Sequence, residues 1–217
     1  MQIDIRPDDA LIVIDVQNDF CPGGALAVPD GDAVVAPINW LIGQFQHVIL
    51  TQDWHPAGHR SFASTHPGHK PFETVAWDYG PQTLWPDHCL QGSAGADFHP
   101  ALKIDTAELV IRKGFRSGID SYSAFMENDK TTRTGLSGYL RERRLNRLFF
   151  CGLALDFCVG WSALDGRRDS FPAFLIEDAS RAIDLDGSRA AMLAELARAD
   201  AVVMQMSDFR STGAGGN

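Results

Sequence analysis

The sequence predicts an α/β fold: a three-layer α/β/α sandwich with a six-stranded, mostly parallel sheet. Two observations lead to this prediction. Short apolar runs rich in β-branched residues recur along the 217-residue chain, and segments with helical spacing of apolar residues separate them. Strands that alternate with helices form parallel sheets that are covered on both faces and joined by right-handed crossovers.

Each apolar run is short enough for one buried strand. The six predicted strands span 10–16, 47–51, 108–113, 147–152, 172–177 and 201–206. Apolar residues at helical spacing predict helices over about 34–45 and 188–199, and a third helix that begins near Asp156. Asp186 or Ser188 is expected to cap the helix over 188–199.

The chain shows no internal repeat and no linker, so we expect a single domain over residues 1–210. Residues 52–107 have little regular pattern and are rich in Pro, Gly, His and Trp. A connection of this length is usually functional or disordered, and its aromatic content argues against disorder. We therefore expect a long metal-binding loop region at 52–107. The glycine-rich residues 211–217 are expected to form a flexible tail.

Charge and composition exclude several classes of partner. The formal net charge is −9, which argues against a surface for nucleic acid or anionic membranes. No apolar stretch reaches the length of a membrane span, and the first residues lack the pattern of a signal peptide. The four cysteines have no CxxC spacing, so we expect free thiols in the cytoplasm. A homo-oligomer is left open.

Four reactive side chains stand at the ends of successive predicted strands: Asp15, Asp53, Lys113 and Cys158. Ligands of parallel α/β sheets bind beyond the carboxyl ends of the strands. Each residue has an ordinary alternative, because ionisable side chains favour exposed element ends in any protein. Together they predict one pocket that contains carboxylates, an amine and a thiol.

Cys158 is the candidate nucleophile. It lies in the first turn of the predicted helix, where free backbone N–H groups and the helix dipole favour a thiolate. The alternative is a buried structural cysteine, which is the commoner role of a single Cys. We interpret Cys21, Cys89 and Cys151 as structural. Cys89 follows His88 in an apparently extended segment, so its side chain is expected to point away from that of His88.

The histidines suggest a metal site. All seven lie between His47 and His99. In an extended segment, Asp53 and His55 point to the same side, and His88 can complete a three-ligand site with open positions. The remaining loop histidines are expected to cap loops or face solvent, although any of them could compete as a ligand: His59, His66, His69 and His99.

Several motifs together resemble one family. They are Asp15-Val-Gln-Asn-Asp-Phe20, Gln52-Asp-Trp-His-Pro56, Trp85-Pro-Asp-His-Cys-Leu90, Lys113-Gly114, Asp120-Ser-Tyr-Ser-Ala-Phe125 and Gly152-Leu-Ala-Leu-Asp-Phe-Cys-Val159. The set is similar to that of the nicotinamidases, the metal-dependent branch of the isochorismatase-like cysteine hydrolases. The resemblance extends from about residue 10 to about residue 206, and it implies the isochorismatase-like hydrolase fold.

The resemblance implies a catalytic triad of Asp15, Lys113 and Cys158. Cys158 would attack the carboxamide carbon of nicotinamide to form a thioester, and Asp15 would take the thiol proton while Lys113 holds Asp15 ionised. The resemblance also implies an oxyanion hole made by the backbone N–H groups of Ala154 and Cys158. A cis peptide between Leu153 and Ala154 is implied as well.

The resemblance further implies one divalent metal ion, with zinc first and iron or manganese as alternatives, on Asp53, His55 and His88. Phe20 and Trp85 are similar to family residues that wall the substrate ring. Some members have a further metal ligand near the position of Ser61, which would bind here through water or not at all. Leu155 departs from the small polar residue that is common at its position.

The implied function is hydrolysis of nicotinamide to nicotinate and ammonia in NAD salvage, with pyrazinamide as a second substrate. One rival hypothesis is an amidohydrolase of the same superfamily that acts on carbamoyl or ureido substrates. Such relatives generally lack the paired metal motifs. Another rival is a non-catalytic binding protein on the same fold, which the intact Asp15, Lys113 and Cys158 argue against.

Overall fold

The computed structural model describes residues 2–210 and is built on a parallel sheet. The sheet consists of β1 (Asp9–Ile14), β2 (His47–Asp53), β5 (Leu109–Lys113), β6 (Arg147–Leu153), β7 (Ala173–Arg181) and β8 (Val202–Met204). Its order is β5-β2-β1-β6-β7-β8, and every neighbouring pair is parallel. The predicted α/β fold with six strands is confirmed.

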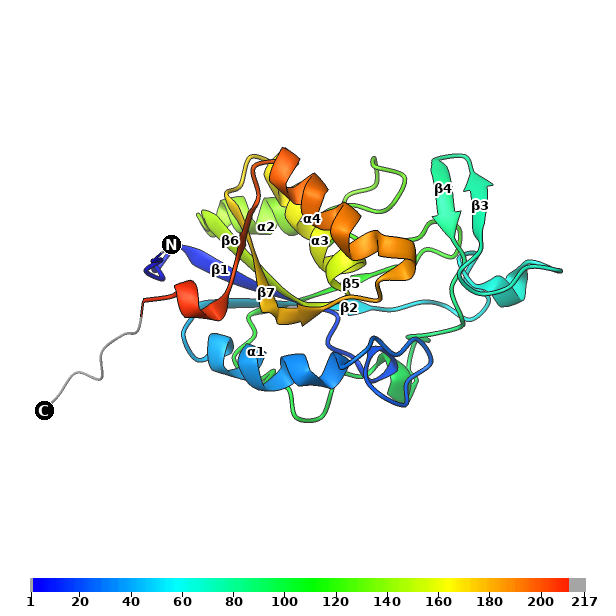
Figure 1. Cartoon of the computed structure of the whole chain (residues 1–217), viewed down its shortest axis with the longest axis horizontal. Coiled ribbons are helices and arrows are strands. Elements are labelled where there is room, and N and C mark those ends of the chain that lie inside the picture. Colours follow the sequence, from blue (N-terminus) through cyan, green and yellow to red (C-terminus); the bar gives the residue numbers. More distant parts are fainter. Residues whose placement is uncertain (1, 211–217) are drawn as a thin grey trace, which may run out of the picture.

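Helices cover both faces of the sheet (Figure 1). One face is covered by α1 (Val35–Ile42), and the other by α2 (Leu136–Glu142), α3 (Gly160–Arg168) and α4 (Ser188–Arg198). Side chains of β1 alternate between these layers, as a pleated strand requires. Leu11 and Val13 pack in the core on the α1 side, and Ile12 and Ile14 pack in the core on the other side. The central strand is therefore buried on both faces, which explains its continuous apolar sequence.

Two sequence-based expectations about the helices need correction. Helix α4 is not capped by Asp186 or Ser188, because Gly187 occupies the N-cap position with φ 82° and no side-chain cap is formed. The Ser188 hydroxyl instead donates a hydrogen bond to the Asp156 carboxylate. Helix α2 was not predicted as an element, since its seven residues include Ser137, Gly138 and two charged residues, which obscure its apolar spacing.

The region 52–107 is more regular than its sequence suggested. It contains an antiparallel hairpin of β3 (Thr74–Trp77) and β4 (Gly80–Thr83) and two short 3-10 helices, Ala63–Thr65 and Ala94–Ala96. Trp77 and Leu84 pack with Ala63 in a small core of their own. The hairpin lies at the end of the molecule opposite the N-terminus (Figure 1). Strands of four residues are too short to produce a clear alternating pattern in the sequence.

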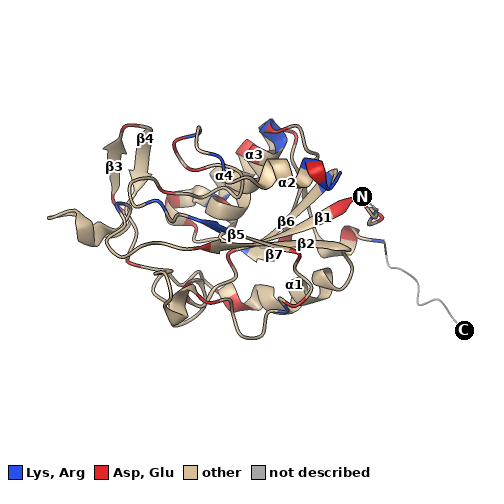
Figure 2. Cartoon of the chain, turned by 180° about the vertical axis from the view of Figure 1, so that it is seen from behind, with Lys and Arg blue, Asp and Glu red and all other residues tan. Residues whose placement is uncertain are grey.

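No helix within residues 2–210 is long and apolar enough to cross a membrane. Basic residues of α2 and α3 lie next to acidic ones (Figure 2).

The flexible tail predicted for 211–217 lies outside the described residues. The single domain over 1–210 stays a prediction.

A close contact between β1 and β6 requires glycine at position 152. Gly152 has φ 120°, and a Cβ atom there would lie 2.1 Å from the backbone oxygen of Ile14. The two residues are register partners in neighbouring strands. Because Gly152 lies six residues before Cys158, this contact helps to set where the chain leaves the sheet toward the candidate nucleophile.

We expect Gly152→Ala to lower the free energy of unfolding by about 3 kcal/mol, because the new methyl group meets the backbone at an unfavourable φ. Urea denaturation followed by circular dichroism measures this change. The matched control is Gly138→Ala in α2, where a Cβ meets nothing within 4 Å. That substitution should stabilise the protein by about 0.5–1 kcal/mol, since alanine favours a helix. Equal midpoints for Gly152→Ala and the unmodified protein would contradict the close contact.

Candidate active site and metal centre

The strand-end residues meet around the ammonium group of Lys113. Its Nζ lies 2.8 Å from Asp15 Oδ2 and 3.1 Å from Asp53 Oδ1. It also lies 3.4 Å from the Sγ of Cys158 and donates a hydrogen bond of 2.9 Å to the Ser121 carbonyl. Lys113 and Asp15 are fully buried. The structure thus brings together all four residues that the sequence placed at strand ends.

Asp15 is held rigidly beyond the end of β1. Its φ of 47° turns the chain sharply after Ile14. Its backbone N–H donates to Thr51 Oγ1, and the Thr51 hydroxyl donates back to Asp15 Oδ1 at 2.6 Å. Burial raises the pKa of the Asp15 carboxyl above its usual value, although the neighbouring Lys113 opposes this shift. A carboxylate with a raised pKa is a better proton acceptor than an ordinary one.

Cys158 lies in a π-helical turn, Leu155–Val159, that connects β6 to α3. Burial raises the pKa of its thiol well above the usual value, and this outweighs the opposing effect of Lys113. Desolvation therefore acts against the thiolate that the helix position favours. Asp15 and the thiol both lie against Lys113 Nζ, so a proton acceptor stands beside the thiol.

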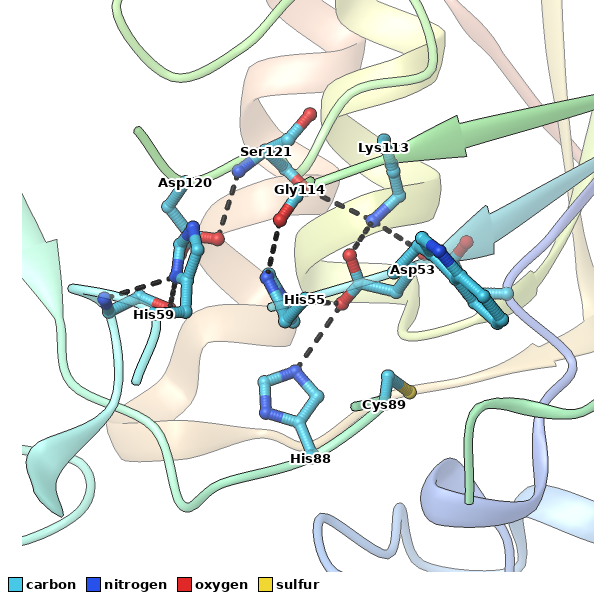
Figure 3. A network of polar contacts seen from close by, with 12 residues as sticks. Asp53, His55, His59, His88, Cys89, Lys113, Gly114, Asp120 and Ser121 are labelled. Carbon is cyan, nitrogen blue, oxygen red and sulfur yellow. Dashed lines mark hydrogen bonds and ion pairs between the residues drawn. The ribbon is translucent and has the colours of Figure 1, made fainter. Parts of the chain in front are cut away.

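The three predicted metal ligands converge at one point (Figure 3). The Nε2 atoms of His55 and His88 lie 3.0 Å and 3.3 Å from Asp53 Oδ2. The Nδ1 of His55 lies 2.9 Å from the Gly114 carbonyl, and the Nδ1 of His88 lies 2.8 Å from the Pro86 carbonyl. A carbonyl can only accept, so each Nδ1 carries a proton, and each Nε2 is the atom that faces Asp53 and would bind a metal. Two imidazoles and a carboxylate fit a divalent transition metal.

The charge on Asp53 suits a metal ligand. Burial alone would raise its pKa, but His55 and Lys113 together lower the pKa well below the usual value. Asp53 is therefore ionised, with Oδ1 toward Lys113 and Oδ2 toward the histidines.

Gly114 is required by the position of His55. Its φ is 66°, and a Cβ atom would lie 2.5 Å from His55 Cε1. The residue after Lys113 must therefore be small for the imidazole to approach the backbone carbonyl that fixes its proton.

His59 is fully buried and bonds the loop carbonyl of Arg116, so of the two expected roles the structure shows loop capping and not solvent exposure. With His55 and Asp120 it forms a second group of potential ligand atoms. Both its nitrogens are already used: Nε2 donates to the Arg116 carbonyl at 2.8 Å, and Nδ1 accepts from the Ser61 N–H at 3.2 Å. This group therefore lacks the lone pair that a metal needs.

Ser61 is buried, and its hydroxyl lies 2.8 Å from His59 Nδ1. It therefore supports His59, which in turn joins this loop to the backbone at Arg116. Three of the other loop histidines agree better with the sequence-based view: His66, His69 and His99 bond loop atoms or an exposed carboxylate.

The other cysteines do not line the pocket that contains Cys158. Burial raises the pKa of Cys21 to about 11 and also raises that of Cys151. Cys89 has φ 45°, so the extended backbone assumed for it is wrong. Burial and then Asp53 raise the pKa of Cys89 well above its usual value. Its thiol is not part of the metal-ligand groups found among residues 2–210.

A pocket opens between the thiol and the metal ligands. Phe20 and Trp85, predicted as ring walls, both line it with Cys158 and Ala154. Further lining residues had no role in the sequence-based prediction: Leu26, Asp120, Tyr122, Phe157 and Ile183. Asp120 and Tyr122 lie within the motif 120–125 on which the family resemblance rests, so the sequence could have indicated their place in the site. Leu26 and Ile183 come from loops without such a signal.

The backbone beside the thiol has the geometry that the family resemblance implied. The peptide between Leu153 and Ala154 is cis. Ala154 precedes the π-helical turn and lines the same pocket as Cys158.

A support residue that the sequence did not reveal is Gln17. Its side-chain amide donates to the Asp53 carbonyl and accepts from the Asp53 N–H, as a neighbouring strand would. This contact holds the end of β2, and with it Asp53, next to the segment that follows β1.

Comparison with known proteins agrees with this geometry. Residues 9–208 match the model of the isochorismatase domain family. A nicotinamidase of Acinetobacter baylyi is 54% identical over 179 residues, which cover 82% of this chain and 84% of the relative. A nicotinamidase of Escherichia coli is 41% identical over 213 residues, which cover 95% and 99%.

Solved structures are similar as well. An Acinetobacter baumanii nicotinamidase and pyrazinamidase superimposes with a TM-score of 0.92 at 53% identity, covering 94% of this chain and 98% of that one. The L. infantum protein PnC1, solved with nicotinate, gives 0.85 at 40% identity and 97% and 99% coverage. A zinc-bound pyrazinamidase of Pyrococcus horikoshii gives 0.74 at 32% identity and 92% and 100% coverage. The buried triad, the metal-ligand group and these relatives lead to one assignment: the chain belongs to the isochorismatase family, and within it to the nicotinamidases.

Proposed function

We propose that this protein hydrolyses nicotinamide to nicotinate and ammonia in NAD salvage, and that it also accepts pyrazinamide. The observation that carries the proposal is the single pocket that joins Cys158 to Asp53 and His88. The pocket has a thiol and a proton acceptor at one end and metal ligands at the other. This arrangement suits a ring that carries a carboxamide group and a nitrogen atom. The names of the relatives support the same substrates.

In the proposed reaction, Asp15 accepts the proton of Cys158 as the sulfur attacks the carboxamide carbon. The tetrahedral intermediate collapses to a thioester, and Asp15 returns the proton to the departing ammonia. Water then attacks the thioester carbon, with Asp15 again as proton acceptor, and the thiol and nicotinate are released. Lys113 stays charged throughout, because Asp15 and Asp53 raise its pKa well above the usual value against the effect of burial.

The oxyanion is proposed to lie between the backbone N–H groups of Ala154 and Cys158. Backbone donors that are already oriented stabilise a developing negative charge without reorganisation. Such a site contributes about 3–4 kcal/mol to lowering the barrier. Phe20 and Trp85 are proposed to bind the faces of the substrate ring, as aromatic walls suit a flat heterocycle.

Asp53, His55 and His88 are proposed to hold one zinc ion, with iron or manganese as alternatives that the same donors fit. The zinc-bound Pyrococcus relative supports this choice. When bound, the metal supplies a Lewis acid for the pyridine nitrogen, and thereby favours substrates with a ring nitrogen placed as in nicotinamide.

The cytoplasm is the proposed location. The four cysteines are free thiols, as a reducing compartment allows.

Cys158→Ala should lower kcat for ammonia release from nicotinamide by at least about 10³-fold, because no thioester can form. Asp15→Asn should have a similar effect while leaving the metal bound, since Asp15 does not ligate it. Coupled detection of ammonia measures the rates, and elemental analysis measures the metal. Cys21→Ala is the control and should keep kcat. Full activity of Cys158→Ala would refute the mechanism.

Removal of the metal should abolish turnover, and zinc should restore it. His88→Ala should weaken zinc binding by about 100-fold or more, because a direct ligand contributes at least as much as the groups that orient it. Titration of the chelated protein with zinc in a calorimeter gives the affinity without relying on activity. His69→Ala, at an exposed histidine, is the matched control. A chelated enzyme with an unchanged rate would contradict the metal's role.

A further inference from the structure

Gln82 connects the β3–β4 hairpin to the wall of the substrate pocket. Its side chain is almost fully buried, with 1% exposure. Its Nε2 lies 2.6 Å from Asp120 Oδ2 and 3.1 Å from the Tyr122 Oη. Its Oε1 accepts from the Tyr79 hydroxyl at 3.1 Å and from Asn128 Nδ2 at 3.2 Å. One amide therefore joins the hairpin to a segment that lines the pocket.

The orientation of this amide is determined by its neighbours. An ionised carboxylate can only accept, so the atom beside Asp120 must be the nitrogen. The opposite atom is then the oxygen, and the donor group of Asn128 faces it. Nε2 also lies 2.8 Å from the Thr83 carbonyl oxygen, so its two protons serve three acceptors, of which the Tyr122 oxygen is the most distant.

Tyr122 lies at the centre of the aromatic wall. Burial, with Asp120, raises the pKa of the phenol well above its usual value. The ring contacts Trp85 and Phe157 edge to face, at centroid distances of 6.1 Å and 5.5 Å. The amide of Gln82 lies within hydrogen-bond distance of the phenol oxygen and so holds the polar end of this ring.

The same segment also contacts the catalytic centre. Ser121, between the two residues that Gln82 binds, accepts a hydrogen bond from Lys113 through its carbonyl. Asp120 and Tyr122 both line the pocket with Cys158. A shift of this segment would change the pocket wall and the environment of Lys113 together.

We propose that Gln82 is a positioning residue for substrate binding: its amide holds Asp120 and Tyr122 against the pocket, so that the β3–β4 hairpin is part of the substrate site. Gln82 itself does not line the pocket and acts through the two residues that it binds. This inference rests on the proposed function, because Tyr122 packs against Trp85, which is assigned to the nicotinamide ring.

The test compares steady-state kinetics of Gln82→Met with those of the unmodified holoenzyme, using nicotinamide. Methionine keeps the volume and removes the hydrogen bonds, so KM should rise about tenfold while kcat changes less than about threefold. Gln91→Met, at an exposed glutamine of the same region, is the matched control and should keep both constants. A purely structural role would lower the melting temperature without this change in KM, and an unchanged KM would overturn the proposal.

A double-mutant cycle with Tyr122→Phe tests whether Gln82 acts through the wall. The phenylalanine variant keeps the ring and removes the hydroxyl. If Gln82 acts through Tyr122, the fold-rise in KM of the double variant should be smaller than the product of the fold-rises of the two single variants. A fold-rise equal to that product would overturn the route through Tyr122. Should Gln82→Met fail to fold, Tyr79→Phe removes one hydrogen bond to the same amide. A rise in KM of about threefold would then support the proposal, and no rise would refute it.

These measurements distinguish failure of the proposed function from failure of the proposed role of Gln82. If the unmodified holoenzyme releases no ammonia from nicotinamide, the substrate assignment is wrong. If it does, and the variants behave like it, only the role of Gln82 is wrong.

Discussion

The buried ammonium of Lys113 is the interaction on which the active site depends. An ammonium has three protons, and here Asp15, Asp53 and the Ser121 carbonyl surround it, with the Cys158 sulfur as a further neighbour. An unpaired charge in such a place would cost about 3–5 kcal/mol. The lysine and the two carboxylates are therefore stable only as a unit, and the sheet must bring their strand ends together.

The sheet meets this requirement through its register. Asp53 and Lys113 are partners at the ends of β2 and β5, and Ile14 and Gly152 are partners at the ends of β1 and β6. The first pair places the metal-ligand carboxylate beside the ammonium. The second pair lies where β1 and β6 leave the sheet. Asp15 and the segment that leads to Cys158 therefore start side by side. Proton transfer, attack and metal binding thus share one rigid frame.

The region 52–107 supplies the other side of the pocket. His55 and His88 come from its loops, and backbone carbonyls determine which of their nitrogens carries the proton. Trp85 and the hairpin residue Gln82 connect to the Tyr122 wall. The parallel sheet therefore carries the groups proposed to break the amide bond, and the long region carries most of the groups proposed to select and orient a substrate. This division explains why so long a connection is packed rather than loose.

The sequence by itself determined the fold class, the approximate positions of the six strands and the candidates Asp15, Lys113, Cys158, Asp53, His55 and His88. It could do so because the carboxyl ends of parallel strands must meet at one edge of the sheet, and because the metal motifs are local in the chain.

Only the tertiary structure decided the direction in which desolvation shifts the pKa of Cys158, the burial of His59 and the place of Gln82. Each depends on groups far away in the chain: Gln82 meets Asp120 across 38 positions, and His59 meets Arg116 across 57. Burial and hydrogen bonding arise from the packing of such distant segments. No local pattern encodes them, because spacing along a chain says nothing about which side chains desolvate one another.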